Sequence, residues 1–258
     1  MLDLAVQIVN YKTKKYLPDC IEGVISDLQD ANLSYKILIL DNASGDNLDN
    51  FSKEYRNVAI YYAGKNIGFG AGHNFLAKKV ESKYILVLNP DIKFIEGKTI
   101  EKLLENFKKE KEIAVVGPKL LIDEGRPQLW DHGELDGFLA WIANNAAGSY
   151  WEEKNKKIKV AWVSGAFFMV KRNVFKSTGG FDENFFLYKE EEDLCLRLRQ
   201  LGYDIIYDPS AKVLHYGSVI ASKDKFMPAS IAYFQEKHFN GKILFPIFKF
   251  VYDKFLEK

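Results

Sequence analysis

Short apolar runs alternate with amphipathic segments through the first half of the chain. Each run is rich in β-branched or large apolar residues and short enough for a strand of a sheet covered on both faces. The runs predicted as strands are 4–9, 35–40, 58–62, 84–88 and 114–116. Helical patterns lie between them over 15–28, from about residue 72, and over 100–111. This alternation predicts an α/β fold, with a Rossmann-like, mixed and mostly parallel sheet flanked by helices.

The second half of the chain adds one long apolar segment and one helix with strong end signals. The apolar segment, 160–170, predicts a central strand that returns to the sheet. The helix is predicted over 189–201, with acids in its first turn, arginines near its end and Gly202 as its C-terminal stop. The last segment, 223–258, is predicted to form a helical extension.

Composition and charge act mainly by exclusion. The 258 residues carry 36 Lys and Arg against 35 Asp and Glu, a formal net charge of +1, which argues against a surface that is one large nucleic-acid footprint. Cys20 and Cys195 lie far apart and outside any C-x-x-C pair, which favours a reducing compartment over a disulfide scaffold or structural zinc. No basic and then apolar leader precedes the first strand, and the longest apolar run is about half a membrane span. We therefore expect a cytoplasmic protein.

Asn and Asp side chains follow the predicted strands of the first half. They are Asn10, Asp41, Asn42, Asn66, Asn74, Asn89 and Asp91, with Tyr11 beside the first. Any one of them is typical of a turn or a helix cap. Ligands of such sheets bind outside the carboxyl ends of the strands, however, and these residues recur at four strand ends. An acid at Asp41 is able to accept the imide N–H of a pyrimidine base, and one at Asp91 is able to hold Mg²⁺ with phosphate oxygens.

The segment 66–74 has three glycines, at 68, 70 and 72, that would let the backbone approach a phosphate or a sugar. A dinucleotide fingerprint needs G-x-G-x-x-G, and its last position here is His73. The pattern therefore argues against an NAD-dependent oxidoreductase, which would otherwise explain the alternating strands.

Glu191 is the acid of the 189–201 helix that is predicted to face inward. The residues on its face form an apolar stripe: Leu194, Cys195, Leu198 and Leu201. Burial there would raise the pKa of the Glu191 carboxyl toward that of a working base. Asp193 is expected to form a surface ion pair with Arg197, and Glu192 and Arg199 are expected to point outward. The alternative is that all these acids only complement the helix dipole.

Five motifs occur in order along the chain. They are VNY at 9–11, DNAS at 41–44, N-x-G-F-G-x-G-x-N at 66–74, LNPD at 88–91 and F-D-E-x-F-F-x-Y-x-E-E-x-D-L-C-x-R at 181–197. Together they resemble the inverting family 2 glycosyltransferases of GT-A fold, closest to the rhamnosyltransferase-type branch. The resemblance covers roughly residues 4–220, and the order of the five motifs makes it specific.

The resemblance implies a donor site for a nucleoside diphosphate sugar, dTDP-rhamnose or a UDP-hexose. The residues it places there are Asn10, Tyr11, Asp41, Asn42, Asn66, Gly68, Gly70, Asn74 and Asn89. Asn10 and Tyr11 would line the pocket of the base and ribose, and Asp41 would contact the base. An inverting transfer needs a base for the acceptor hydroxyl, and the second acid of the family's pair falls on Glu191, which the helical pattern selects independently.

The resemblance also implies a site for Mg²⁺ or Mn²⁺. The segment Asn89-Pro90-Asp91 stands where the family carries its D-x-D-type motif and keeps only the last aspartate. His215, in a late His-x-Gly-Ser element, is the candidate second ligand or a contact of the diphosphate. The structural alternative for a single histidine after a strand carries about equal weight.

The acceptor, a glycan or a lipid-linked saccharide, is assigned to the second half. Its candidate contacts are Trp130, Trp162, Gly165 and Glu190. Tryptophans 130, 141 and 151 suit stacking on sugars, and packing in the core is the alternative. We expect a catalytic domain over 1–222, with a nucleotide-sugar half at 1–120 and an acceptor half at 121–222.

The extension at 223–258 carries seven Lys and nine aromatic residues. Such a helix can lie on an anionic membrane, pack on the catalytic domain or join a second copy of the chain as a homodimer. A lipid-linked acceptor would favour peripheral contact with the inner membrane face. No nucleic-acid partner is expected. The alternatives to a transferase are a non-catalytic nucleotide or sugar binder of the same fold and, less favoured, the oxidoreductase.

Overall fold

The computed structural model describes residues 1–123, 125–135, 140, 151–217 and 223–240. The strands are β1 (Leu2–Asn10), β2 (Tyr35–Asp41), β3 (Val58–Tyr62), β4 (Ser82–Leu88), β5 (Ile92–Phe94), β6 (Ile113–Asp123), β7 (Arg126–Pro127), β8 (His132–Gly133), β9 (Ile158–Lys159), β10 (Trp162–Val163), β11 (Phe167–Lys171) and β12 (Asp204–His215). The helices are α1 (Leu17–Leu28), α2 (Asp49–Glu54), α3 (Phe69–Ala77), α4 (Thr99–Lys109), α6 (Arg172–Ser177), α7 (Glu190–Gln200) and α8 (Lys223–Phe239).

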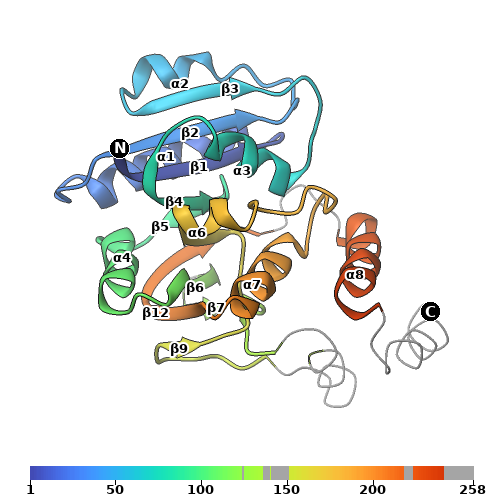
Figure 1. Cartoon of the computed structure of the whole chain (residues 1–258). Helices are drawn as coiled ribbons and strands as arrows, with labels where there is room; N and C mark the ends of the chain where they lie inside the picture. Colours follow the sequence, from blue (N-terminus) through green and yellow to red (C-terminus); the bar gives the residue numbers. More distant parts are fainter. Residues whose placement is uncertain (124, 136–139, 141–150, 218–222, 241–258) are drawn as a thin grey trace.

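The strands form one large mixed sheet in the order β3-β2-β1-β4-β11-β6-β12-β5 (Figure 1). The first four are parallel, as the alternation of strands and helices predicts. β11 runs antiparallel between β4 and β6, and β12 is parallel to β6. The carboxyl ends of β1, β2 and β4 therefore meet at one edge, where Asn10 lies opposite Asp41 and Ile8 opposite Leu88.

Helices cover both faces of the sheet, which is why its strands are apolar throughout. α1, α2 and α4 pack on one face, against residues such as Leu86 and Leu88 of β4. α6 and α7 pack on the other, against Ile85 and Val87 of the same strand, and α3 covers β1 and β2 on that side. The alternation along β4 follows from the two-residue repeat of a strand. His73, the residue that breaks the dinucleotide pattern, is buried in this core, and burial lowers its pKa to about 3.

Several element boundaries differ from the predicted ones. The helix expected from residue 15 begins at Leu17 after a short 3-10 turn, because Pro18 suits only the first turn of a helix. The helix expected near residue 72 begins at Phe69. The single strand expected over 160–170 is two strands, β10 and β11, which are separated at Ser164, Gly165 and Ala166. β10 pairs with β8 in a separate two-stranded sheet, so only β11 is a central strand of the main sheet.

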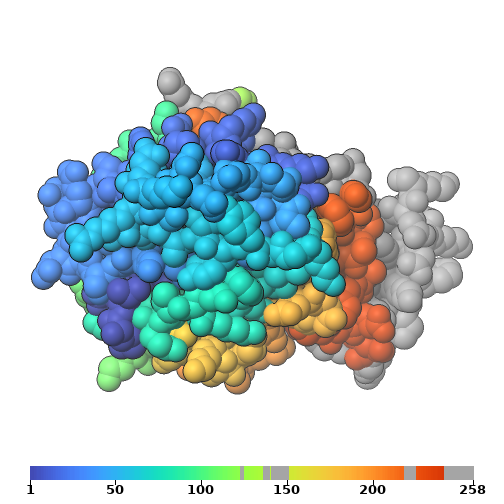
Figure 2. Space-filling view, turned by 90° about the horizontal axis from the view of Figure 1, so that it is seen from above, coloured from blue at the N-terminus to red at the C-terminus, as the bar shows by residue number. Residues whose placement is uncertain are grey.

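The first part of the predicted helical extension is α8, which stands beside α7 at one side of the molecule (Figure 1), and residues 241–258 of the extension lie outside the described residues. Figure 2 shows the red atoms of α8 next to gold atoms, the colour of α6 and the residues that follow it. Among the helices of the described residues, none has the length and apolar character needed to cross a membrane.

Candidate active site

A cavity of about 1380 Å³ opens at the carboxyl ends of the parallel strands. Its walls come from strand ends, from the first turn of α7, from the end of β12 and from α8. Twelve of the residues singled out from the sequence line it: Tyr11, Asn42, Asn66, Gly68, Asn89, Asp91, Trp130, Trp162, Gly165, Glu190, Glu191 and His215. The fold thus brings the predicted donor, metal, acceptor and base residues to one place.

Asn10 and Asp41 do not line this cavity but brace the edge of the sheet beside it. Asn10 Nδ2 donates to Asp41 Oδ1 at 2.8 Å, and Asn10 Oδ1 accepts from Thr13 Oγ1 at 2.7 Å. Asp41 is nearly buried and also accepts from the backbone N–H of Ser44 at 3.1 Å. Its outer side contributes to a neighbouring cleft of about 530 Å³ beside Tyr62.

Asn42 and Asn66 shape the glycine-rich loop that enters α3. Asn42 Nδ2 donates to Asn66 Oδ1 at 2.9 Å, and Asn42 Oδ1 accepts from the backbone N–H of Ile67 at 2.9 Å. Gly68 has a φ of +87°, and a Cβ added there would lie 2.5 Å from the carbonyl oxygen of Phe186. Only glycine fits this close approach of two backbones, which joins the donor loop to the segment leading into α7.

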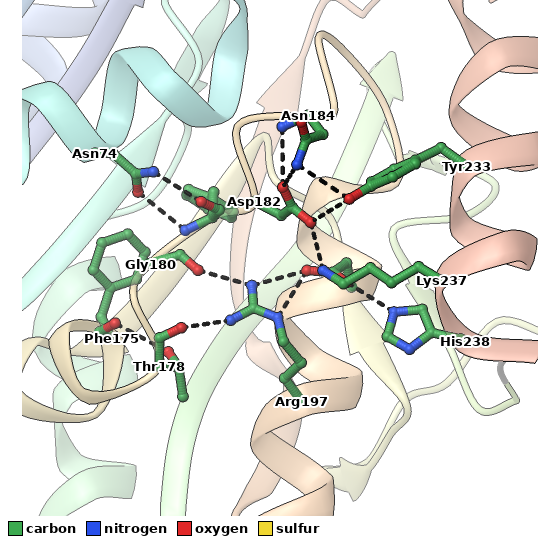
Figure 3. Close-up of polar contacts among 12 residues, drawn as sticks. Asn74, Phe175, Thr178, Gly180, Asp182, Asn184, Arg197, Tyr233, Lys237 and His238 are labelled. Atoms are coloured by element: carbon green, nitrogen blue, oxygen red, sulfur yellow. Dashed lines mark hydrogen bonds and ion pairs between the residues drawn. The ribbon is translucent and has the colours of Figure 1, made fainter.

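Gly70 and Asn74 also lie outside the cavity, and both contact Phe181 in the segment that leads into α7. Asn74 Nδ2 donates to Phe181 O at 2.8 Å, and the N–H of Phe181 donates back to Asn74 Oδ1 at 3.0 Å (Figure 3). A Cβ on Gly70 would meet Phe181 Cβ at 2.9 Å. The family motif in this part of the chain therefore positions a loop in addition to lining the donor side.

The two predicted metal ligands come together although they are more than 100 residues apart in the chain. Asp91 Oδ1 lies 3.4 Å from His215 Nε2. The other ring nitrogen of His215, Nδ1, faces Gln128 Oε1 at 2.7 Å, so Nδ1 carries the proton and Nε2 keeps its lone pair. Asn89 Nδ2 contacts this Nε2 at 3.3 Å. Gln128 orients the histidine, and nothing in the sequence marked it.

This arrangement fits a divalent cation. A carboxylate oxygen and an imidazole lone pair that face each other are two acceptors, which a cation held between them satisfies. In the part of the chain that the structure describes, no group of three or more His, Cys, Asp or Glu side chains could hold a metal. Asp91 and His215 would therefore supply two ligands, with the remaining positions left to diphosphate oxygens and water.

Glu190 and Glu191 begin α7 and both line the cavity. Burial raises the pKa of Glu191 to about 7, and the nearby charge of Glu192 adds to this, while a hydrogen bond from the Gly165 backbone opposes it. Glu190 is almost fully buried, and its Oε2 has no hydrogen-bond partner. Burial, and then the charge of Glu191, raise the pKa of Glu190 well above its ordinary value. Burial thus favours the protonated form of Glu190, and Glu191, with a pKa of about 7, is able to take up a proton near neutral pH.

Tyr188 and Lys189, directly before these glutamates, have left-handed backbones with φ values of +73° and +72°. Such conformations cost about 1–3 kcal/mol each in a residue with a side chain. Lys189 also pairs with Glu192 at 2.7 Å, so Glu192 is partly buried at the cavity wall and not directed outward as expected. The glutamates therefore follow a strained turn that the surrounding structure must hold.

Two further expectations for α7 are wrong. Asp193 does pair with Arg197, at 2.8 Å, but its side chain is fully buried and not at the surface. Leu201 is 63% exposed, because α7 ends at Gln200 before the apolar stripe reaches it. The sequence pattern of α7 alone does not show that another helix covers the face that carries Asp193.

The side of the cavity predicted to hold the acceptor has many apolar residues. Trp130 and Trp162 line it, Trp151 instead donates to buried Asp131 at 3.3 Å, and Trp141 lies outside the described residues. Four large hydrophobic residues that line the cavity are exposed to solvent: Ile122, Leu129, Phe186 and Tyr216. The first half of α8 adds Lys225, Phe226, Met227 and Ile231. Of the aromatic residues in the motif at 181–197, Phe186 and Tyr188 belong to the lining of the cavity.

Comparisons with known proteins agree with this fold and site. Residues 5–179 match the family described as Glycosyl transferase family 2. The chain is 29% identical over 219 residues to the N-acetylglucosaminyl-diphospho-decaprenol L-rhamnosyltransferase of Mycobacterium tuberculosis, covering 75% of this chain and 69% of that protein. It is 30% identical over 225 residues to rhamnosyltransferase WbbL of Escherichia coli, covering 81% of each.

Among solved structures, the mannosyltransferase PcManGT from Pyrobaculum calidifontis, in complex with GDP-Man and Mn²⁺, has a similar fold. The TM-score is 0.61 at 10% identity, with 88% of this chain and 59% of that chain covered, so this chain spans less than two thirds of that structure. A structure of Staphylococcus aureus TarS in complex with UDP gives a TM-score of 0.58 at 14% identity, over 88% of this chain and 62% of that chain.

The mixed sheet, with its cavity at the parallel strand ends, has the GT-A fold of these solved structures. The chain belongs to glycosyl transferase family 2, as the match over most of its length shows. It is therefore an enzyme, which sets aside the oxidoreductase and the non-catalytic binder considered from the sequence.

Proposed function

We propose that the chain transfers a sugar, with rhamnose favoured, from a nucleoside diphosphate donor to a hydroxyl of a glycan or lipid-linked saccharide, with inversion. Both curated relatives described above are rhamnosyltransferases, and one is named for a decaprenyl-diphosphate-linked acceptor. The observation that carries the proposal is that one cavity holds the Glu191 carboxylate together with the Asp91–His215 pair.

Glu191 is the general base of this proposal. Its carboxylate removes the proton of the acceptor hydroxyl as that oxygen forms a bond to the anomeric carbon of the donor. The bond from that carbon to the diphosphate breaks on the opposite side, and its electron pair leaves with the diphosphate oxygen. One displacement of this kind inverts the anomeric centre. A pKa near 7 leaves a large share of Glu191 ionised at neutral pH and still basic enough to act.

Asp91 and His215 would hold Mg²⁺ or Mn²⁺ beside the diphosphate, with Gln128 orienting the imidazole through Nδ1. The cation would take the place that the Asn89 amide has at Nε2. The bound cation would neutralise the charge that develops on the leaving diphosphate. Tyr11, Asn42, Asn66, Gly68 and Asn89 line the donor side, and Asn10, Asp41, Gly70 and Asn74 support it from outside the cavity.

The acceptor side of the proposal consists of Trp130, Trp162, Gly165 and Glu190, together with the exposed apolar residues at the mouth of the cavity. An apolar mouth suits an acceptor that carries a lipid. We propose that the enzyme acts in the cytoplasm, on lipid-linked acceptors at the inner face of the membrane, with residues 223–258 as the segment nearest that surface.

The test is a transfer assay with a panel of donors. The enzyme is incubated with Mn²⁺, N-acetylglucosaminyl-diphosphoprenol and one donor at a time: dTDP-rhamnose, UDP-glucose, UDP-galactose or GDP-mannose. The masses of the products are measured by mass spectrometry. We expect one added sugar from a pyrimidine nucleotide donor, dTDP-rhamnose before the others, and an inverted linkage by NMR. A retained linkage, or a product from none of the four donors, would contradict the proposal.

A further inference from the structure

Helix α8 makes hydrogen bonds to both ends of the segment that carries Glu190 and Glu191. Ser230 Oγ donates to the carbonyl oxygen of Leu187 at 2.7 Å, directly before the strained Tyr188 and Lys189. On the other side of the glutamates, Asp193 Oδ1 accepts from His238 Nε2 at 2.7 Å. The contacts of a single helix therefore bracket Glu190 and Glu191.

Asp193 is the centre of the second contact. Its side chain is fully buried, and each of its oxygens has a cationic or imidazole partner. Oδ1 meets Lys237 Nζ at 2.6 Å as well as His238, and Oδ2 accepts from Arg197 Nε at 2.8 Å. Burial by itself would raise the pKa of Asp193, but the hydrogen bonds from His238 and Lys237 outweigh it and hold the pKa below its ordinary value.

Arg197 extends this contact to the start of the loop. Its guanidinium donates to the carbonyl oxygens of Thr178 at 2.9 Å and Gly180 at 2.8 Å (Figure 3). The side chain thus joins α7 to the glycine turn that precedes Phe181. Arg197 makes these hydrogen bonds inside the protein and does not line the cavity, so it supports the site from behind.

Lys237 connects the two ends of the segment. Its Nζ also meets Asp182 Oδ2 at 2.6 Å, where the Tyr233 hydroxyl donates at 3.0 Å (Figure 3). Between these contacts Phe185 is buried, with its ring 4.8 Å from that of Tyr233. Asp182, at the start of the loop, and Asp193, in the first turn of α7, therefore both pair with the same lysine of α8.

The opposite half of α8 lines the cavity that Glu191 faces. Lys225, Phe226, Met227 and Ile231 belong to its wall. The Phe226 ring lies 5.0 Å from that of Phe186, on the loop before the strained turn. One helix thus forms part of the cavity wall and holds the segment of the base.

We propose that α8 positions the base, with Asp193 as the positioning residue that Lys237 and His238 hold in place. The first turn of α7 follows a strained backbone. The contacts of Asp193 with Lys237 and His238 fix this turn, so that Glu191 meets the hydroxyl of an acceptor that lies against the first half of α8. The inference rests on the proposed function, in which Glu191 takes the proton. A displacement of about 1 Å at a reacting group can cost about a hundredfold in rate.

The test replaces Lys237, whose side chain is partly exposed, in the full-length enzyme. Lys237→Met is expected to lower kcat about tenfold or more, while the KM for the donor and the Kd for its nucleoside diphosphate change less than about twofold. Lys237→Arg keeps a cation near both aspartates, and we expect it to retain at least about a third of the wild-type kcat. A role in folding alone would not produce this split between kcat and donor binding.

Arg172→Met is the matched control, because Arg172 is also mostly buried and pairs with Glu81, between α6 and the turn before β4, away from the cavity. It is expected to lower the melting temperature and to leave kcat within about twofold. Asp193→Asn, as a second variant, should lose kcat at least as strongly as Lys237→Met. If folded Lys237→Met and Asp193→Asn keep the kcat of Arg172→Met, the positioning role is wrong.

Glu191→Gln, assayed in parallel, separates this inference from the proposed function. If Glu191→Gln transfers sugar at the wild-type rate, the assignment of the base fails, and the positioning role fails with it. If Glu191→Gln is inactive and the α8 variants are not impaired, only the positioning role fails.

Discussion

Glu190 and Glu191 are adjacent in the chain, but their side chains have different surroundings. Glu190 is buried without a partner for its Oε2, so the neutral acid is favoured. Glu191 is only partly buried at the cavity wall and lies against Gly165, with 3.8 Å between its Cβ and a Cβ built on that glycine. The charge of Glu191 also raises the pKa of Glu190, so a proton held by Glu190 leaves Glu191 available as the base.

The raised pKa of Glu191 predicts how activity depends on pH. The base works only when ionised, so kcat should rise with pH through a limb centred near 7, where this carboxyl loses its proton. A profile of kcat at saturating donor and acceptor between pH 5 and 9 measures the limb. A limb near 4.5, the ordinary pKa of glutamate, would show that the group in action is a different one.

The same shift predicts an effect on stability with the opposite sign. Because the pKa of Glu191 is higher in the folded than in the unfolded chain, folding takes up protons between about 4.5 and 7, and stability falls as pH rises through this window. Glu191→Gln removes this penalty, which amounts to at most about 3 kcal/mol at pH 8. We expect the variant to melt at a higher temperature than wild type at pH 8 and to lose that advantage at pH 4.5. An advantage that is equal at both values would contradict the shift.

Asp91 and His215 predict that nucleotide binding depends on a metal. The melting temperature of the wild type should rise when UDP or dTDP is added together with Mn²⁺. It should rise much less with the nucleotide alone or with Mn²⁺ alone, since a ligand stabilises the folded state only when it binds. Asp91→Asn and His215→Ala should each lose most of the Mn²⁺-dependent part. Asp204→Asn, at a surface pair with Lys159, is the control that should keep it. A nucleotide shift that is independent of Mn²⁺ would rule out this pair as the metal site.

At the scale of elements, the glycine-rich loop shows how a single backbone contact joins the donor loop to the base segment. The N–H of Phe69 donates to Phe186 O at 3.0 Å, next to the left-handed Gly68. Gly68→Ala would place a Cβ against that carbonyl and strain the backbone, so we expect a loss of about 1–3 kcal/mol in the free energy of unfolding and weaker nucleotide binding.

Gly64→Ala is the matched control for this change. A Cβ at Gly64 meets nothing within 4 Å, and the residue has no left-handed backbone. Urea unfolding of the two variants measures the difference. Equal stabilities would show that the contact between Gly68 and Phe186 is not required.

Most strands of the first half could be predicted because local pattern decides them, whereas α2 and β5 were missed and β6 extends seven residues beyond its predicted end. β3 was placed at its observed bounds, and β1, β2 and β4 within one or two residues. The pattern of segment 160–170 did not show that it forms two strands, because Ser164, Gly165 and Ala166 look compatible with a strand. In the structure these three residues line the cavity, and the strand is interrupted there. The end of the apolar stripe at Leu201 depends likewise on where α7 stops.

At the scale of the whole molecule, the site depends on contacts between distant segments. The sequence pattern selected Glu191, Asp91 and His215, each from local spacing or from a resemblance, and the fold brings all three to one cavity. Gln128, Ser230 and the burial of Asp193 were not predictable, because each follows from how a remote element packs. The near-zero net charge of the chain combines an acidic segment and a basic extension, which meet in the fold where Asp182 and Asp193 pair with Lys237.

The central claim is that Glu191 acts as the base of a sugar transfer in this cavity. The most direct measurement compares wild type and Glu191→Gln for both kcat of transfer and Kd of the nucleoside diphosphate with Mn²⁺. Loss of a general base costs about 10²- to 10⁴-fold, so we predict a kcat lowered by that factor and a Kd within about twofold of wild type. Transfer by Glu191→Gln at a rate near that of wild type would contradict the account. Loss of transfer in Glu190→Gln but not in Glu191→Gln would contradict it as well.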